Sequence, residues 1–346
     1  MKTMSEKPEQ MPDNATDRPL VTFALFAYNQ EDFIREAIEG AFSQTFEPLE
    51  IIFSDDCSSD RTFEIMQEMA AEYVGPHKLK VMRNKTNVGT LNHVLKVAHE
   101  ATGEYIVVAA GDDISLKERV VRTIEFMELN HYCAISTTAT IINGQGVSER
   151  ETHTTSVDSR YEIIFQNRVK RIYGATAAYR VDCLPEYRPD IPRVLTDDFF
   201  FELLFYYDGL KIGFLDQPSI SYRVHERSTS VNLNAKSVHQ IMDRERRIIK
   251  SKLEYARSYS FLLKHIRCKA GFSLSDPKFI ELSFRARKRI CFLERRSNWY
   301  DMGFLEKIYF ISFYIKNDGF ISFIPRIFGL KIYALASRFK DLLVKK

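Results

Sequence analysis

The sequence has few cysteines, and their spacing excludes the structures that cysteines most often build. There are five cysteines among 346 residues, an odd number, and none of them forms a CxxC pair. This spacing argues against a disulfide framework and against a structural zinc site. It favours a protein of a reducing compartment.

Long apolar runs are also missing. No window reaches the roughly 18 uninterrupted apolar residues that are needed to span a bilayer. Residues 1–18 are polar, contain two prolines and lack the apolar core of a signal peptide. We interpret residues 1–18 as a flexible leader and expect a cytoplasmic protein.

Charge is nearly balanced over the whole chain but unevenly distributed. The formal net charge is +3, yet residues 235–346 contain 25 Lys and Arg against 10 Asp and Glu, and the remainder contains 24 against 36. An acidic portion is thus followed by a basic one. This asymmetry indicates an anionic partner for residues 235–346.

The first part of the chain alternates between strand-like and helix-like periodicity. Apolar residues recur at helical spacing between four short apolar runs, which are residues 20–26, 51–53, 79–82 and 105–110. Four strands separated by three helices predict right-handed βαβ crossovers, and hence an α/β fold with a mostly parallel sheet flanked by helices. Further along, we expect strands at 133–142 and 172–181, a loop at 143–160 and a buried helix at 199–207.

Paired aspartates follow two of the predicted strands. Asp55-Asp56 comes at the end of the second strand, and Asp112-Asp113 comes after the fourth. Ligands on parallel sheets bind at the carboxyl ends of strands, where crowded carboxylates are usually kept for a cation or a polar ligand. Asp112-Asp113 is therefore a candidate site for Mg²⁺ and a diphosphate. A helix cap with a solvated turn is an alternative explanation that the pair alone does not exclude.

Two further groups of residues are candidates for a catalytic or ligand-binding role. Asp197-Asp198 precedes the aromatic run at 199–207, and a carboxylate beside such an apolar wall could have a raised pKa and act as a general base. Capping of the following helix is the alternative that the local sequence favours. His225 lies among hydroxyl and cationic residues, which favours contact with a ligand or a phosphate.

Six segments occur in a characteristic order: Phe26-Ala27-Tyr28-Asn29, Ser43-Gln44-Thr45, Asp55 to Asp60, Asn87-Val88-Gly89, Gly103 to Ile106, and Gly111-Asp112-Asp113. Together they resemble the family 2 glycosyltransferases, from Leu20 to Ser230 and most strongly in the first half. The resemblance implies a GT-A type fold with a Rossmann-like sheet. Residues 19–234 would form the catalytic domain, with a nucleotide-sugar-binding half at 19–113 and an acceptor half at 114–234. A helical, basic and aromatic extension would follow at 235–346.

The resemblance also implies roles for individual residues. Asp113 would be the direct ligand of Mg²⁺ or Mn²⁺, His225 would approach the metal or the diphosphate, and Asp198 would be the catalytic base. The nucleotide-sugar donor would be bound by Phe26, Ala27, Tyr28, Asp56, Asn87 and Asp112, among which Tyr28 and Asp56 would contact the nucleoside.

The implied activity is inverting, metal-dependent transfer of a single sugar from a nucleotide sugar to a glycan acceptor, expected to be lipid-linked, in cell-surface polysaccharide synthesis. A single transfer is expected because the Gln-x-x-Arg-Trp signature of processive members is missing, and the one tryptophan is Trp299. One alternative is a non-catalytic nucleotide-sugar-binding scaffold, which would not need a base. Another is a receiver-like domain that accepts phosphate on Asp55, but it would end near residue 130.

The basic extension interleaves aromatic residues with Lys and Arg over residues 298–346. Helices that lie in the headgroup plane fit this pattern, so we expect peripheral binding to the anionic cytoplasmic face of the inner membrane. Packing on the catalytic domain or at a dimer interface is the alternative, and formation of a homo-oligomer stays open. No nucleic-acid-binding signature is present, and we expect no nucleic-acid partner.

Overall fold

The computed structural model describes residues 18–151, 172–188 and 197–225, together with single helical positions between 250 and 294. The chain divides into two units, residues 1–231 with 257–283 and residues 232–256 with 284–346, and each is described by itself. In the second unit, Leu253, Ile290 and Leu293 form a small apolar cluster. Most of the expected leader and of the extension at 235–346 lies outside the described residues, so the predicted domain boundaries stay predictions.

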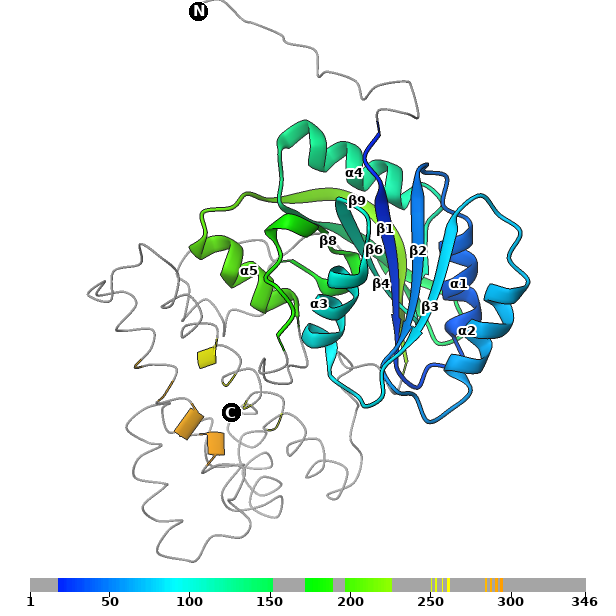
Figure 1. The fold of residues 1–346 in the computed structure, drawn as a ribbon, viewed down its shortest axis with the longest axis horizontal. Coiled ribbons are helices and arrows are strands. Elements are labelled where there is room, and N and C mark those ends of the chain that lie inside the picture. The colour runs from blue at the N-terminus through cyan, green and yellow to red at the C-terminus, as the bar shows by residue number, and fades with distance from the viewer. Residues whose placement is uncertain are drawn as a thin grey trace, which may run out of the picture. The chain divides into compact units, whose positions relative to one another are not determined.

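The first unit begins with the predicted alternation of strands and helices. Its elements are β1 (Val21–Ala27), α1 (Ile34–Phe42), β2 (Leu49–Asp55), α2 (Thr62–Ala71), β3 (Lys78–Arg83), α3 (Thr90–Glu100) and β4 (Tyr105–Ala110). The four strands pair in parallel in the order β3-β2-β1-β4 (Figure 1). The expected βαβ crossovers and the parallel first half of the sheet are thereby confirmed.

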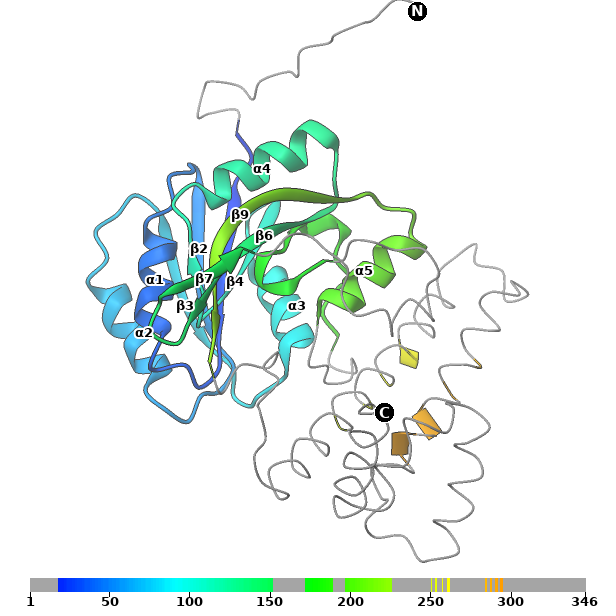
Figure 2. The same ribbon diagram turned by 180° about the vertical axis from the view of Figure 1, so that it is seen from behind.

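The second half completes a mixed sheet. It contains β5 (Ile114–Ser115), α4 (Arg119–Asn130), β6 (Ala134–Asn143), β7 (Ser148–Glu151), β8 (Ala178–Arg180), α5 (Asp198–Tyr207) and β9 (Ile212–Val224), with 3-10 turns η2 (Gly174–Thr176) and η3 (Val181–Cys183). The described residues form one nine-stranded sheet in the order β3-β2-β1-β4-β8-β6-β9-β5, with β7 paired to β6 (Figure 2). Strand β8 is antiparallel to β4 and β6, whereas β6 and β9 are parallel.

Some expectations for this half were wrong. The strand expected over 172–181 is reduced to β8, because the 3-10 turn η2 occupies part of that apolar stretch. The loop expected at 143–160 contains β7. Strand β9 was not predicted, since its hydrophobic pattern is interrupted by Asp216, Gln217 and Pro218, where its pairing with β6 shifts register.

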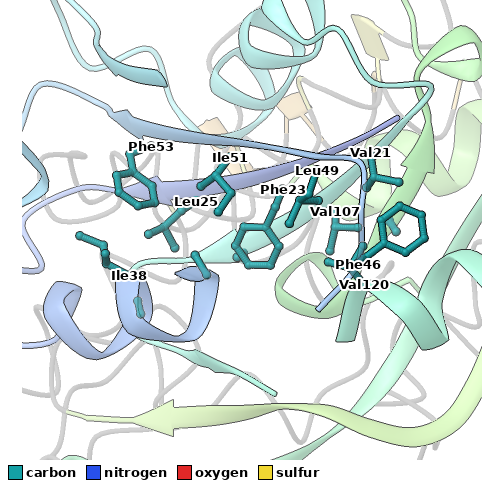
Figure 3. Packing of buried hydrophobic residues seen from close by; sticks show 14 of the residues in the cluster. Val21, Phe23, Leu25, Ile38, Phe46, Leu49, Ile51, Phe53, Val107 and Val120 are labelled. Atoms are coloured by element: carbon teal, nitrogen blue, oxygen red, sulfur yellow. The ribbon is translucent and has the colours of Figure 1, made fainter. Parts of the chain in front are cut away.

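The main core lies between the sheet and three helices. Alternate residues of β1, β2 and β4 point to one face, where α1, α2 and α4 cover them with their apolar sides. Figure 3 shows Phe23, Leu25, Ile51 and Phe53 on the strands facing Ile38 of α1. Helices α3 and α5 lie on the other side of the sheet (Figures 1 and 2). No helix in the described part of the chain is long and apolar enough to cross a bilayer.

The strand register brings several chain ends to one edge of the sheet. Ala27 pairs with Asp55, and Asp55 pairs with Arg83, so the segments that follow β1, β2 and β3 start side by side. Because β8 is antiparallel to both β4 and β6, strands β6 and β9 run in the same direction as β4. The end of β9, with His225 just beyond it, therefore reaches the same edge as Asp112.

Candidate functional site

The loops that follow β1 and β2 are joined to each other by hydrogen bonds. Asn29 Oδ1 accepts the Ser59 backbone N–H at 2.8 Å, and the Gln30 N–H donates to Thr62 Oγ1 at 2.8 Å. These bonds hold the two loops in one arrangement at the edge of the sheet. The backbone at the end of β1 is thus rigidly placed.

Both carboxylates of the first aspartate pair, Asp55-Asp56, bind other groups of the chain. Asp55 is fully buried, accepts the Ser58 N–H at 2.9 Å and pairs with Arg83 Nε at 3.2 Å. Asp56 is also buried, at 4% exposure. It accepts hydrogen bonds from Asn84 Nδ2 at 2.9 Å and from two backbone N–H groups, those of Val88 at 2.9 Å and Gly89 at 3.0 Å. Asp56 therefore fixes the loop that carries Asn87, and its expected contact with a nucleoside stays a prediction.

The other residues expected to bind the donor lie around this loop. The Phe26 carbonyl accepts the Gly111 N–H at 2.8 Å, and the Ala27 carbonyl accepts the Asp56 N–H at 2.9 Å, so both contribute through the backbone. Tyr28 is 47% exposed at the edge of the sheet. The Oδ1 atom of Asn87 is buried and has no hydrogen-bond partner within the described part of the chain.

The acidic turn after β4 faces the end of β9. Gly111 is required there, because a Cβ atom would lie 2.6 Å from Gln30 Oε1 and 2.8 Å from the Ala27 Cβ. Asp112 Oδ2 lies 3.1 Å from His225 Nε2, and both side chains are partly exposed. The structure thus brings together two residues that are 113 positions apart in the sequence.

Asp113 is buried, unlike the partly exposed Asp112 and His225. Its Oδ1 accepts the Arg223 backbone N–H at 2.8 Å, and its Oδ2 is buried without a partner among the described residues. Burial and the neighbouring Asp112 raise the pKa of Asp113 well above its usual range, although Arg119 and Arg223 act in the opposite direction. Of the two carboxylates, Asp112 is the one that faces His225.

Arg223 is the residue that sequence reasoning missed. Its side chain is 1% exposed and donates from Nε to the Asp112 carbonyl at 3.0 Å, from Nη1 to the Gly144 carbonyl at 3.1 Å and from Nη2 to Glu36 at 2.8 Å. The Phe33 ring contacts both this guanidinium, at 5.1 Å, and the His225 ring, at 4.5 Å. A usable signal was the spacing: Arg223 is two residues before His225 and so lies on the same side of the strand.

A second buried arginine, Arg119, joins the strands and the 3-10 turn next to the acidic turn. Arg119 donates from Nη2 to the carbonyls of Val108 and Ala175, at 2.5 and 3.0 Å, and from Nη1 to Ser115 Oγ at 2.9 Å. Burial lowers the pKa of Arg119 to about 10, so it stays charged at neutral pH. The positive charges of Arg119 and Arg223 both act on Asp113, in the direction that lowers its pKa.

The third aspartate pair begins α5. The Asp197 carbonyl accepts the Phe201 N–H at 3.0 Å, and Asp198 Oδ2 accepts the Gly174 N–H at 3.4 Å. Asp197 is buried, and this burial, together with the charge of Asp198, raises its pKa to about 7. Asp198 is the less buried of the two. The helix start expected at this pair is confirmed.

The donor set at the acidic turn is suited to a cation that is completed by other ligands. Within the described residues, no group of three or more His, Cys, Asp or Glu side chains is arranged to hold a metal. Asp112 and His225 supply one carboxylate and one imidazole, both of which Mn²⁺ accepts. A hard divalent cation commonly takes one or two protein carboxylates and completes its shell with phosphate oxygens and water. The residues present fit such a cation.

Comparison with known proteins shows which protein family this chain is similar to. Residues 22–188 match the family model described as "Glycosyl transferase family 2". The EpsE protein of Bacillus subtilis is 35% identical over 133 residues, which are 37% of this chain and 46% of that protein. A second relative is WfaP of Escherichia coli, named as UDP-Glc:alpha-D-GlcNAc-diphosphoundecaprenol beta-1,3-glucosyltransferase. It is 33% identical over 111 residues, which are 32% of this chain and 41% of that protein. The matches thus span less than half the length of these two relatives.

A solved structure has the same fold. The mannosyltransferase PcManGT from Pyrobaculum calidifontis, in complex with GDP-Man and Mn²⁺, superposes with a TM-score of 0.50. The superposition covers 99% of this chain and 92% of that one at 15% sequence identity. At this identity the likeness concerns the fold alone, and it confirms the expected α/β architecture.

The raised pKa of Asp197 predicts a pH-dependent stability. An aspartate in the unfolded chain titrates near 4, so the folded protein binds the extra proton between about pH 4 and pH 7. Stability is then fullest at acid pH and falls as the pH rises through this window, by an amount of order 4 kcal/mol. Asp197→Asn should lose less stability than the wild type between pH 5 and pH 8 in urea unfolding. The exposed control Asp216→Asn should follow the wild type, and equal slopes for all three proteins would contradict the pKa shift.

Proposed function

Since residues 22–188 match the model of glycosyl transferase family 2, we propose that the chain transfers a sugar from a nucleotide-sugar donor to a glycan acceptor. The observation that supports this most directly is the Asp112–His225 pair at the edge of the sheet, with Asp198 at the start of α5 in the same unit. A transferase needs one group that stabilises a leaving diphosphate and another that activates an acceptor hydroxyl. The two groups correspond to these two needs.

We propose that Asp112 and His225 hold a divalent cation, Mg²⁺ or Mn²⁺, together with the donor diphosphate. The resemblance assigned the direct contact to Asp113, but its Oδ1 is occupied by the Arg223 N–H and its Oδ2 is buried. Asp112 has the partly exposed carboxylate beside His225, which favours Asp112 as the ligand. When bound, the cation would neutralise charge on the departing diphosphate. Asp113 and Arg223 would keep the turn in position.

We propose Asp198 as the base. The acceptor hydroxyl would attack the anomeric carbon, the bond from that carbon to the diphosphate oxygen would break, and Asp198 would take the hydroxyl proton. Attack from the side opposite to the leaving group inverts the anomeric centre in a single displacement. The single-transfer, inverting reaction expected from the sequence is retained in this proposal.

The acceptor and the location are further parts of the proposal. We propose a lipid-linked glycan acceptor in cell-surface polysaccharide synthesis, and the name of WfaP, which includes a diphosphoundecaprenol-linked sugar, supports this choice. Residues 235–346, with their excess of 15 positive charges, would bind the anionic cytoplasmic face of the membrane. The second candidate, a non-catalytic nucleotide-sugar-binding scaffold, predicts donor binding without transfer.

Asp198→Asn should lower transfer by about 100-fold or more, because the acceptor proton no longer has a base to accept it. Transfer is measured with Mn²⁺ over a panel of nucleotide sugars and extracted lipid-linked acceptors, and donor binding is measured by calorimetry. Binding should be retained in the variant, and Asp216→Asn should behave like the wild type. Undiminished transfer by Asp198→Asn would refute the base. Donor binding with no transfer by the wild type would favour the scaffold.

Asp112→Asn should weaken binding of Mn²⁺ in the presence of a nucleoside diphosphate by about tenfold or more, since a first ligand is lost. Calorimetric titration of Mn²⁺ into protein saturated with UDP or GDP measures this affinity directly. Asp216→Asn should again match the wild type. An unchanged Mn²⁺ affinity in Asp112→Asn would contradict the assignment of the cation to Asp112.

A chain that ends at Ser297 should lose its association with membranes, because it lacks the interleaved basic and aromatic residues of 298–346. Fractionation of cells expressing the full and the shortened chain measures the change, and retained donor binding controls for folding of the catalytic part. An unchanged membrane fraction would contradict the membrane role of this segment.

A further inference from the structure

Two cysteine thiols that the proposed reaction does not use lie in contact with each other. Cys133 directly precedes β6, and Cys183 is the last residue of the 3-10 turn η3. Their side chains share a hydrogen bond, and both cysteines are free thiols. The fold thus brings together two nucleophilic groups from separate segments of the chain.

The backbone on either side of the contact is fixed by hydrogen bonds. The Cys133 N–H donates to the Lys211 carbonyl at 2.9 Å, and the Cys133 carbonyl accepts the Arg180 N–H at 2.9 Å. Cys183 follows Arg180 by one 3-10 turn, and the first residue of that turn, Val181, donates its N–H to the Glu104 carbonyl at 2.9 Å. Neighbouring strands therefore hold both cysteines in place.

The thiol pair lies away from the candidate site. Arg180 pairs with Tyr105, the first residue of β4, whereas Asp112 follows the end of that strand. Strand β6 runs in the same direction as β4, so Cys133 lies at the edge of the sheet where these strands begin. A chemical change at the thiols should leave the acidic turn accessible.

The two thiols differ in their access to solvent. Cys133 is 8% exposed, and Cys183 is partly exposed, so a reagent in solution meets Cys183 first. Burial, the contact with Cys133 and the negative charge of Asp182 raise the pKa of the Cys183 thiol. Since the thiolate is the reactive form, Cys183 should react slowly at neutral pH and faster in alkaline solution.

We propose that Cys133 and Cys183 are a modification site, which forms a reversible disulfide when the protein meets a small disulfide such as oxidised glutathione. The Cys183 thiolate attacks one glutathione sulfur, the glutathione S–S bond breaks, and the departing thiolate takes up a proton. The Cys133 sulfur then attacks the Cys183 sulfur, and its proton passes to the second glutathione as that leaves. Two protein thiols are oxidised, and one oxidised glutathione is reduced to two glutathione thiols.

The cross-link has a consequence for stability. A disulfide holds its sulfur atoms at about 2 Å, and thiols that already share a hydrogen bond need only a small further approach. The bond would close a loop over residues 133–183, which contains β6, β7, η2 and β8. Because a closed loop restricts the unfolded chain, the oxidised protein should be more stable than the reduced one.

The test treats the purified full chain with oxidised glutathione in mildly alkaline solution. Remaining thiols are blocked with N-ethylmaleimide, and disulfides are mapped by mass spectrometry of unreduced peptides. The peptide that contains Cys133 should be joined to the peptide that contains Cys183, and dithiothreitol should separate them. Oxidation should also raise the midpoint of thermal unfolding by about 5 °C.

Cys291→Ser is the matched control, because Cys291 is exposed and its loss should leave the cross-link unchanged. Cys183→Ser should abolish both the cross-link and the rise in the midpoint, and Cys133→Ala is the second variant. The wild-type peptide map decides the proposal even if neither variant folds. Cys183 that stays a free thiol, carries only glutathione, or is joined to Cys57 or Cys291 as often as to Cys133 would overturn it. These measurements use no donor or acceptor, so their outcome is independent of the proposed function.

Discussion

The buried guanidinium of Arg223 is the group on which the rest of the site depends. A buried charge is costly unless its donors are paired, and this one is paired with acceptors from three separate segments. They are the Asp112 carbonyl of the acidic turn, the Gly144 carbonyl after β6 and the Glu36 carboxylate of α1. An arrangement that moved any of these segments away would leave a charge unpaired inside the protein. Satisfying Arg223 therefore fixes α1, the turn and the end of β6 relative to β9.

The same requirement places the chemical groups. The backbone of Arg223 holds Asp113, and the strand then carries His225 to within 3.1 Å of Asp112. Arg119 connects β4 to η2 by donating to the carbonyls of Val108 and Ala175. Two adjacent carboxylates would repel each other in isolation. Burial and Asp112 raise the pKa of Asp113 well above its usual range, which favours its neutral form beside Asp112, and Asp112 is the carboxylate directed toward the partly exposed His225.

The parts of the fold that depend on local pattern were predictable. Apolar runs of strand length, separated by stripes at helical spacing, gave the four parallel strands and their crossovers. The paired aspartates could be placed at the carboxyl edge for the same reason, because each follows a recognisable strand. Strand β9 escaped prediction because Asp216 and Pro218 interrupt its pattern, and with β9 the position of Arg223 was also lost. The contact of Cys133 with Cys183 joins segments that are far apart in the sequence, and no local signal predicts it.

The sequence by itself determined the α/β class, the likeness to a family and the residue types available at the edge of the sheet, because these depend on neighbours in the chain. The tertiary structure decided which of those residues are buried and which groups each of them contacts. The carboxylate of Asp56 holds the loop of Asn87, and its expected contact with a nucleoside stays a prediction. Asp112 and Asp113 have the same side chain, and one is partly exposed while the other is buried. That difference comes from the long-range contacts of Arg223, which a reading of adjacent residues cannot provide.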